Sequence, residues 1–320
     1  MCAMTTTALS RYWTINVPQK SEAEAAAEAY LFLLPLGKDH FAVSKCIRFH
    51  RWVLFAAVLV TQFITGSIYS LVSLSQPMDA YFQGNLYAGD STVLLMAGSA
   101  SMAVASALSG PALERRGPRW SMTTGTAILA VGLVLGQVAT MATSWGLMFP
   151  AAVCYGTGVG YLLVTSFATL QKWFPDLRGT VNGVVLMAFG SGGGVWNIFF
   201  REVVGPGASR SENMTHVFYL LLLAFVPPLA LCTVVMRTPP DSFRVGGHDM
   251  HGIASDKVPS VSFVQDEYLK VGMTLVNYSA INASVSREAA MVGTERHYYE
   301  QVKALTLVQC IFSTDFLSLF

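Results

Sequence analysis

Between two long apolar segments, the chain reads Gly110-Pro-Ala-Leu-Glu-Arg-Arg-Gly-Pro-Arg119. A polar stretch this short cannot form a domain, so we interpret it as a tight basic turn between two helices that cross a membrane. The composition agrees, because 12% of the residues are charged, whereas a soluble domain carries about 25%. The turn therefore predicts an all-α membrane protein.

Six apolar segments are long enough to be membrane-spanning helices. A helix needs about 20 apolar residues to cross the hydrocarbon core of a bilayer. The six segments have no Lys, Arg, Asp or Glu in their interiors, and they cover approximately residues 52–74, 91–113, 120–141, 145–170, 180–200 and 217–235. Membrane barrels use shorter segments of alternating polarity. We therefore predict a six-helix transmembrane bundle embedded in a lipid bilayer.

The basic residues of the loops predict the orientation. Lys and Arg precede the first segment and recur in the second and fourth loops, but they are absent from the first and third loops. Because basic loops stay in the cytoplasm, this alternation places the N-terminus there. The fifth loop partly disagrees, since it contains Arg201 and Arg210. It also contains Asn213-Met-Thr215, an N-glycosylation acceptor pattern that suits an outside loop.

The chain divides into four predicted parts. Residues 1–50 would form a cytoplasmic N-terminal segment, in which the short apolar run Tyr30–Leu36 is interpreted as mobile or amphipathic. Residues 51–236 would form the bundle, and the polar residues 237–301 a cytoplasmic central loop. Residues 302–320 are apolar again and would begin a seventh helix that stops before completing a crossing.

Polar side chains within the spans are candidates for lining a cavity. The first span has one helix face occupied by Gln62, Gly66, Tyr69 and Ser73. Such a stripe normally faces the bundle interior or a water-filled cavity, so Gln62 and Tyr69 are candidates, with hydrogen bonds to neighbouring helices as the alternative. Tyr155 and Tyr161 flank a glycine-rich stretch and are further candidates, with core packing as the alternative for Tyr155.

Other motifs favour structural roles. The pair His248 and His251 has a possible metal-ligand spacing but lacks the three or four ligands of a real site. The glycine-rich stretches of the fourth and fifth spans have neither a preceding strand nor a Lys-Ser/Thr ending, so they are not nucleotide loops. We expect no metal, no cofactor, no nucleic acid partner and no enzymatic activity.

Three stretches together carry a family resemblance. They are Arg51-Trp52 followed by Gln62 and Gly66-Ser-Ile-Tyr69, the turn Gly110–Arg119, and Lys172-Trp-Phe-Pro-Asp-Leu-Arg-Gly179. They resemble the major facilitator superfamily and, within it, the oxalate/formate antiporter and monocarboxylate-porter-like branch. The third stretch is the most specific of the three. Glu114 departs from the family pattern, which usually has Asp at this position.

The resemblance implies the N-terminal half of a two-half transporter that works by alternating access on small mono- or dicarboxylates. It points to Gln62, Tyr69 and Tyr161 as part of the substrate cavity, and Tyr155 remains a candidate from its position. It also implies a cytoplasmic gate formed by Gly110, Glu114, Arg116, Gly117, Arg119, Lys172 and Arg178. The basic residues that hold carboxylates in the antiporters belong to the second half, so we expect a truncated chain and a second six-helix half as partner.

Two alternatives remain open from the sequence. The chain could be a non-transporting half-protein that acts as a membrane interaction partner, or a nodulin-like facilitator, which shares the Arg-Trp entry and the glycine-rich spans. A seven-helix receptor is disfavoured because its N-terminus should lie outside, whereas the basic loops predict a cytoplasmic N-terminus.

Overall fold

The computed structural model describes residues 27–35, 41–85, 88–204, 210–240 and 243–249 of the 320-residue chain. The chain divides into two units. One comprises Pro18–Pro240, and the other joins Met1–Val17 to Asp241–Phe320. The described part of the second unit is a short antiparallel hairpin of β3 (Arg244–Val245) and β4 (His248–Asp249).

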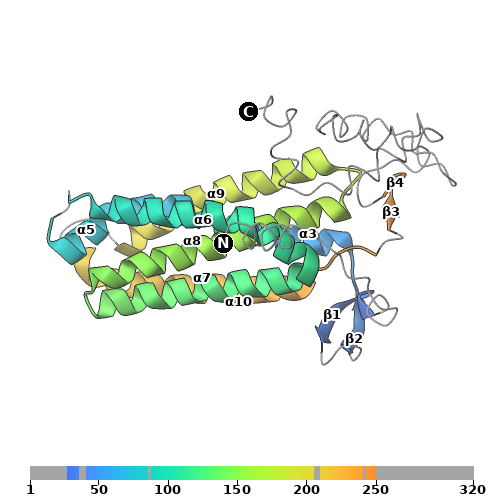
Figure 1. Cartoon of the computed structure of the whole chain (residues 1–320), viewed down its shortest axis with the longest axis horizontal. Coiled ribbons are helices and arrows are strands. Elements are labelled where there is room, and N and C mark those ends of the chain that lie inside the picture. The colour runs from blue at the N-terminus through green and yellow to red at the C-terminus, as the bar shows by residue number, and fades with distance from the viewer. Residues whose placement is uncertain (1–26, 36–40, 86–87, 205–209, 241–242, 250–320) are drawn as a thin grey trace, which may run out of the picture. The chain divides into compact units, whose positions relative to one another are not determined.

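The first unit is a bundle of six helical segments that are long and apolar enough to cross a membrane (Figure 1). The first segment is composite, and it is followed by five long helices. In chain order, the elements are α3 (Arg51–Thr65), α4 (Ser67–Ser70), η1 (Leu71–Leu74) and α5 (Ser75–Gln83), then α6 (Asp90–Arg116), α7 (Pro118–Met141), α8 (Trp145–Trp173), α9 (Arg178–Val204) and α10 (Arg210–Val235). The predicted six-helix membrane bundle is confirmed. The predicted start of a seventh helix, residues 302–320, lies outside the described residues.

The basic turn is shorter than the sequence predicts. Helix α6 continues through Gly110 and Pro111 to Arg116, and Gly117 alone separates it from α7. Gly117 has φ 82° and ψ 166°, a conformation that is open to glycine and strained for other residues. Pro118 then begins α7, where its fixed φ suits the first helical position. The expected ten-residue turn was wrong because membrane helices tolerate an internal proline such as Pro111.

The first span is longer and less regular than predicted. Its helical backbone passes the predicted end near Leu74 and reaches Gln83, with a break at Gly66 and a 3-10 turn over Leu71–Leu74. A Cβ atom at Gly66 would overlap the carbonyl oxygen of Phe189 in α9. The break therefore lies where the backbones of two helices touch, and α9 leaves no room for a side chain at this position.

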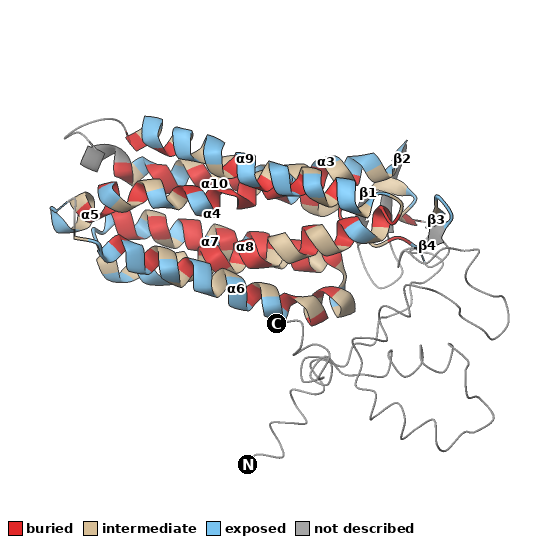
Figure 2. Cartoon of the chain, turned by 90° about the horizontal axis from the view of Figure 1, so that it is seen from above, coloured by how far each residue is buried: buried red, intermediate tan, exposed pale blue. Residues whose placement is uncertain are grey.

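Helix α8 occupies the centre of the packing, against α6 and α7. Glycine makes this approach possible: a Cβ atom at Gly156 would overlap the Gly98 carbonyl oxygen of α6, and one at Gly132 of α7 would lie 2.6 Å from the Tyr155 backbone nitrogen. Close contacts between small residues are a standard means of packing membrane helices. Figure 2 shows many buried residues on the first span, α7 and α8, while α6 and α9 lie at opposite edges with exposed faces.

The N-terminal part of the first unit is a β-hairpin. Strands β1 (Tyr30–Pro35) and β2 (Phe41–Arg48) pair in antiparallel fashion. Tyr30–Pro35, interpreted from the sequence as part of a mobile or amphipathic segment, is a β-strand in the structure. That apolar run is too short to span a membrane, but it is of ordinary length for a strand. Its backbone hydrogen bonds are satisfied by a second run that the sequence interpretation did not pair with it.

Candidate functional site

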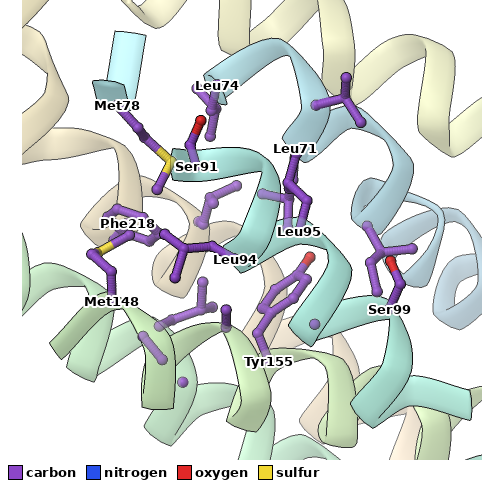
Figure 3. A pocket seen from close by; sticks show the side chains of 18 of the residues that line it. Leu71, Leu74, Met78, Ser91, Leu94, Leu95, Ser99, Met148, Tyr155 and Phe218 are labelled. Atoms are coloured by element: carbon purple, nitrogen blue, oxygen red, sulfur yellow. The ribbon is translucent and has the colours of Figure 1, made fainter. Parts of the chain in front are cut away.

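A cavity of about 110 Å³ lies inside the bundle (Figure 3). Its walls come from the α4–η1–α5 part of the first span and from α6, α7, α8 and α10. The lining consists mainly of Leu, Met, Val, Ile, Phe, Ala and Gly, and no lining residue carries a formal charge. Such an apolar lining with a few polar groups is typical of sites for small organic molecules.

The cavity opens between the first span and α6. Among its lining residues, Tyr69 is 61% exposed and Val72 is 60% exposed. Ser99 of α6 is also exposed. The deeper lining, which includes Leu133 and Met148, is buried. Tyr69 and Ser99 place hydroxyl groups at the opening, and the buried interior is mainly hydrocarbon, with Ser91 and Tyr155 as its polar members.

Two of the four predicted cavity residues line this cavity, and two lie outside it. Tyr69 and Tyr155 line it, whereas Gln62 and Tyr161 do not. Gln62 is fully buried, and its Nε2 donates to Ser166 Oγ in α8 at 2.5 Å. Tyr161 lies beside Gly125 of α7. In this conformation, Gln62 therefore links two helices, which is the alternative that the sequence left open.

Tyr155 closes one wall of the cavity. Its side chain is buried, and its hydroxyl lies 2.5 Å from Ser67 Oγ. Ser67 also donates to the Ile64 carbonyl, just before the break at Gly66. Tyr155 thus ties α8 to the part of the first span that forms the opposite wall.

The predicted gate residues meet at the end of the bundle where α6 joins α7, here called the basic end. Lys172 Nζ of α8 donates to both carboxylate oxygens of Glu114 in α6, at 2.6 and 2.7 Å. The Arg116 guanidinium lies 4.3 Å from the centroid of the Trp120 ring. Arg119 Nε donates to the Met236 carbonyl at 2.9 Å. The remaining gate candidates are Gly110 inside α6, Gly117 at the break and Arg178 at the first position of α9.

Comparison with known proteins identifies the family. Residues 3–196 match the sequence profile described as Major Facilitator Superfamily. The chain belongs to this superfamily. It is therefore a member of a transporter family and not of an enzyme family.

Two curated relatives carry the same family name. MFS-type transporter 1 of Ophiocordyceps sp. (strain BCC 1869) is 27% identical over 131 residues, which cover 41% of this chain and 28% of the relative. The uncharacterized MFS-type transporter YhjX of Escherichia coli (strain K12) is 29% identical over 145 residues, which cover 44% of this chain and 34% of the relative. The matched region thus spans about a third of the length of these curated relatives.

In this superfamily member, two further arginines lie at the basic end, in environments that the sequence did not reveal. Arg51 Nη1 donates to both carboxylate oxygens of Asp176, at 3.0 and 3.2 Å, and its guanidinium lies 4.9 Å from the centroid of the Phe174 ring. Arg237 follows α10 and is 1% exposed. Burial, supported by the positive charge of Arg119 and opposed by Glu28, lowers the pKa of Arg237 to about 10. Arg237 therefore keeps its charge at neutral pH.

The remaining site predictions concern glycosylation and metal. The backbone at Asn213 is helical, within the first turn of α10, and its side chain lies outside the described part of the structure. Glycosylation of Asn213 stays a prediction. His248 belongs to β4, and His251 lies outside the described residues. Within the described ranges, no group of three or more His, Cys, Asp or Glu could hold a metal ion.

Proposed function

We propose that this chain forms one half of a transporter that moves small monocarboxylates across a membrane by alternating access. Membership of the superfamily and the names of both relatives support transport as the activity. In superfamilies of this kind, two halves rock around a site near the middle of the bilayer. The lining of the cavity is the observation that supports the substrate class.

The cavity suits a monocarboxylate better than a dicarboxylate. Its hydrocarbon interior would bury the apolar body of a substrate such as butyrate. The hydroxyls of Tyr69 and Ser99 at the opening would donate hydrogen bonds to the single carboxylate. Oxalate has two charges and no apolar body, and burying a charge without a partner is costly. Within the oxalate/formate and monocarboxylate branch, the cavity thus favours the monocarboxylate members.

The same cavity favours exchange over proton coupling. Neither a carboxylate nor an imidazole side chain lines it, so it offers no obvious proton carrier. An antiporter that exchanges one monocarboxylate for another needs no such group. The Glu114–Lys172 ion pair would belong to the gate between the halves, on the cytoplasmic side according to the distribution of basic residues.

Equilibrium binding tests this proposal. The purified chain in lipid nanodiscs is titrated with radiolabelled butyrate and, separately, with oxalate. We expect saturable butyrate binding and weaker oxalate binding. The substitution Ser99→Leu should weaken butyrate binding about tenfold, equivalent to about 1.4 kcal/mol, because it narrows the opening. Ala100→Leu is the matched control, since Ala100 is the next exposed residue of α6 and does not line the cavity.

Two outcomes would contradict the proposal: oxalate binding more tightly than butyrate, or Ser99→Leu binding butyrate like the unmodified chain. Flux of labelled butyrate into liposomes then asks whether the chain transports without a second half. Flux above that of protein-free liposomes would show that one half is sufficient.

A non-transporting interaction partner is the second candidate function. It is supported by the exposed face of α9, on which Gly183, Gly190, Gly194 and Asn197 follow one another at helical spacing. Lipid leaves the Asn197 amide without a hydrogen-bond partner, so this face suits another protein or water. In this case the chain binds no carboxylate but forms a complex of defined mass, which light scattering of the detergent-solubilised protein would detect.

A further inference from the structure

Arg237 makes an unusually complete set of hydrogen bonds. An arginine side chain has five N–H donors in a planar fork. All five are directed at backbone carbonyls: Nε at Val235 (3.2 Å), Nη1 at Glu28 (2.7 Å) and Tyr30 (2.7 Å), and Nη2 at Leu31 (2.8 Å) and Val234 (3.4 Å). Every N–H donor of the side chain therefore has a carbonyl acceptor.

The five carbonyls come from two separate parts of the chain. Val234 and Val235 end α10, where the last carbonyls of a helix have no partner within the helix. A cation at this position also interacts favourably with the helix dipole. The other three carbonyls belong to Glu28, just before β1, and to Tyr30 and Leu31, the first two residues of β1. One guanidinium thus joins the end of the sixth span to the start of the N-terminal hairpin.

Aromatic and polar contacts surround this junction. The Arg237 guanidinium lies 4.1 Å from the centroid of the Phe49 ring, and the Phe49 and Trp173 rings are 4.9 Å apart. Trp173 Nε1 donates to the Arg237 carbonyl at 2.7 Å, while Arg119 donates to the neighbouring Met236 carbonyl. The ends of α7, α8 and α10 therefore meet the hairpin around a single residue.

We propose that the β1–β2 hairpin is an intramolecular strap and that the hydrogen bonds of Arg237 hold it against the end of α10. With the strap closed, the ends of α7, α8 and α10 are held together at the basic end. Loss of these hydrogen bonds frees the hairpin while the bundle stays folded. This conformational device goes beyond the proposed transport function and does not depend on the substrate.

The geometry requires arginine and not merely a positive charge. Lysine has three donors on a single nitrogen, so it cannot reach five carbonyls on two chain segments. It also lacks the flat guanidinium that stacks on an aromatic ring. Arg51 provides the contrast, because it uses one nitrogen to bond both oxygens of Asp176. An ammonium group can replace this ion pair, although it does not reproduce the approach of the Arg51 guanidinium to the Phe174 ring.

Hydrogen–deuterium exchange on the full chain in nanodiscs tests the strap. We expect Arg237→Lys to accelerate exchange of the β1 and β2 amides at least about tenfold, while the amides of α7 and α8 keep their rates. The matched control Arg51→Lys should leave the hairpin rates unchanged. No substrate is added, so the result is independent of the butyrate experiment.

The strap is refuted if Arg237→Lys leaves the hairpin rates unchanged. It is also refuted if exchange accelerates equally in α7 and α8, because Arg237 would then support the whole bundle and not the hairpin in particular. If Arg237→Lys does not fold, Phe49→Leu replaces it, since this change keeps the arginine and removes the stacked ring. We expect Phe49→Leu to accelerate exchange about threefold, confined to the hairpin, and unchanged rates would overturn the proposal.

Discussion

The basic end and the cavity hold the same helices together by different means. At the basic end, directional polar contacts join the elements, among them the ion pairs Glu114–Lys172 and Arg51–Asp176. Around the cavity, hydrocarbon side chains and close glycine contacts dominate. Charge therefore fixes one end of the bundle, and shape fixes the cavity. Substitutions in the two regions should therefore destabilise the protein by different mechanisms, through steric overlap near the cavity and through lost or reversed charge at the basic end.

The largest effect is expected where shape alone holds the cavity wall. A Cβ atom at Gly156 of α8 would overlap both the Gly98 carbonyl oxygen, beside the cavity, and Ser101 Oγ. In Gly156→Val the two helices must separate, and overpacking costs about 1–3 kcal/mol, with larger costs where the backbone must move. We expect most of the monodisperse protein to be lost in size-exclusion chromatography.

Gly194→Val is the matched control for this substitution. It makes the same change in α9, at a glycine with no atom within 4 Å of the added Cβ. Its yield and melting temperature should stay close to those of the unmodified chain. If Gly156→Val elutes and melts like Gly194→Val, shape complementarity between α6 and α8 matters less than the structure indicates.

The six spans were predictable because hydrophobic length is a property of the sequence alone. The irregularities of these spans were not, because they depend on neighbouring helices. The break at Gly66 follows from the contact with Phe189, more than a hundred residues away. The β-hairpin was missed for a similar reason, since β1 becomes a strand only through its pairing with β2.

The candidate site was predictable in part. Glu114 and Lys172 were both predicted at the cytoplasmic gate, and the structure joins them in an ion pair. Gln62 shows the limit, since its position on a polar stripe could not distinguish a cavity from a contact with Ser166. Arg237 gave no signal, because its partners are backbone carbonyls that no sequence pattern marks.

An intermediate effect is expected at the Glu114–Lys172 ion pair. Both side chains are about a quarter exposed, at 28% and 24%, so the pair should contribute about 1 kcal/mol or less. Glu114→Lys places two positive charges together and should lower the melting temperature by a few degrees. The double variant Glu114→Lys/Lys172→Glu restores opposite charges and should recover most of the loss.

Measuring the single and double variants at several salt concentrations separates electrostatic attraction from changes in packing. Coulombic coupling between partly exposed charges weakens as ionic strength rises. The gap between the single and double variants should therefore shrink in high salt. A double variant that melts no higher than Glu114→Lys would mean that the pair is a by-product of packing and does not hold α6 to α8.

The smallest effect is expected at Tyr155, the polar contact within the cavity wall. Tyr155→Phe removes one hydroxyl and leaves the ring in place, and Ser67 keeps its bond to the Ile64 carbonyl. The loss should be about 0.5 kcal/mol, at the low end for a hydrogen bond, because Ser67 keeps its other bond. Comparing Tyr155→Phe, Ser67→Ala and the double variant in a double-mutant cycle isolates the contact. Additive losses would show that the two hydroxyls do not couple. A coupling energy close to the whole loss seen for Tyr155→Phe would show that the cavity wall also depends on a directional hydrogen bond. The cavity and the basic end would then differ only in degree.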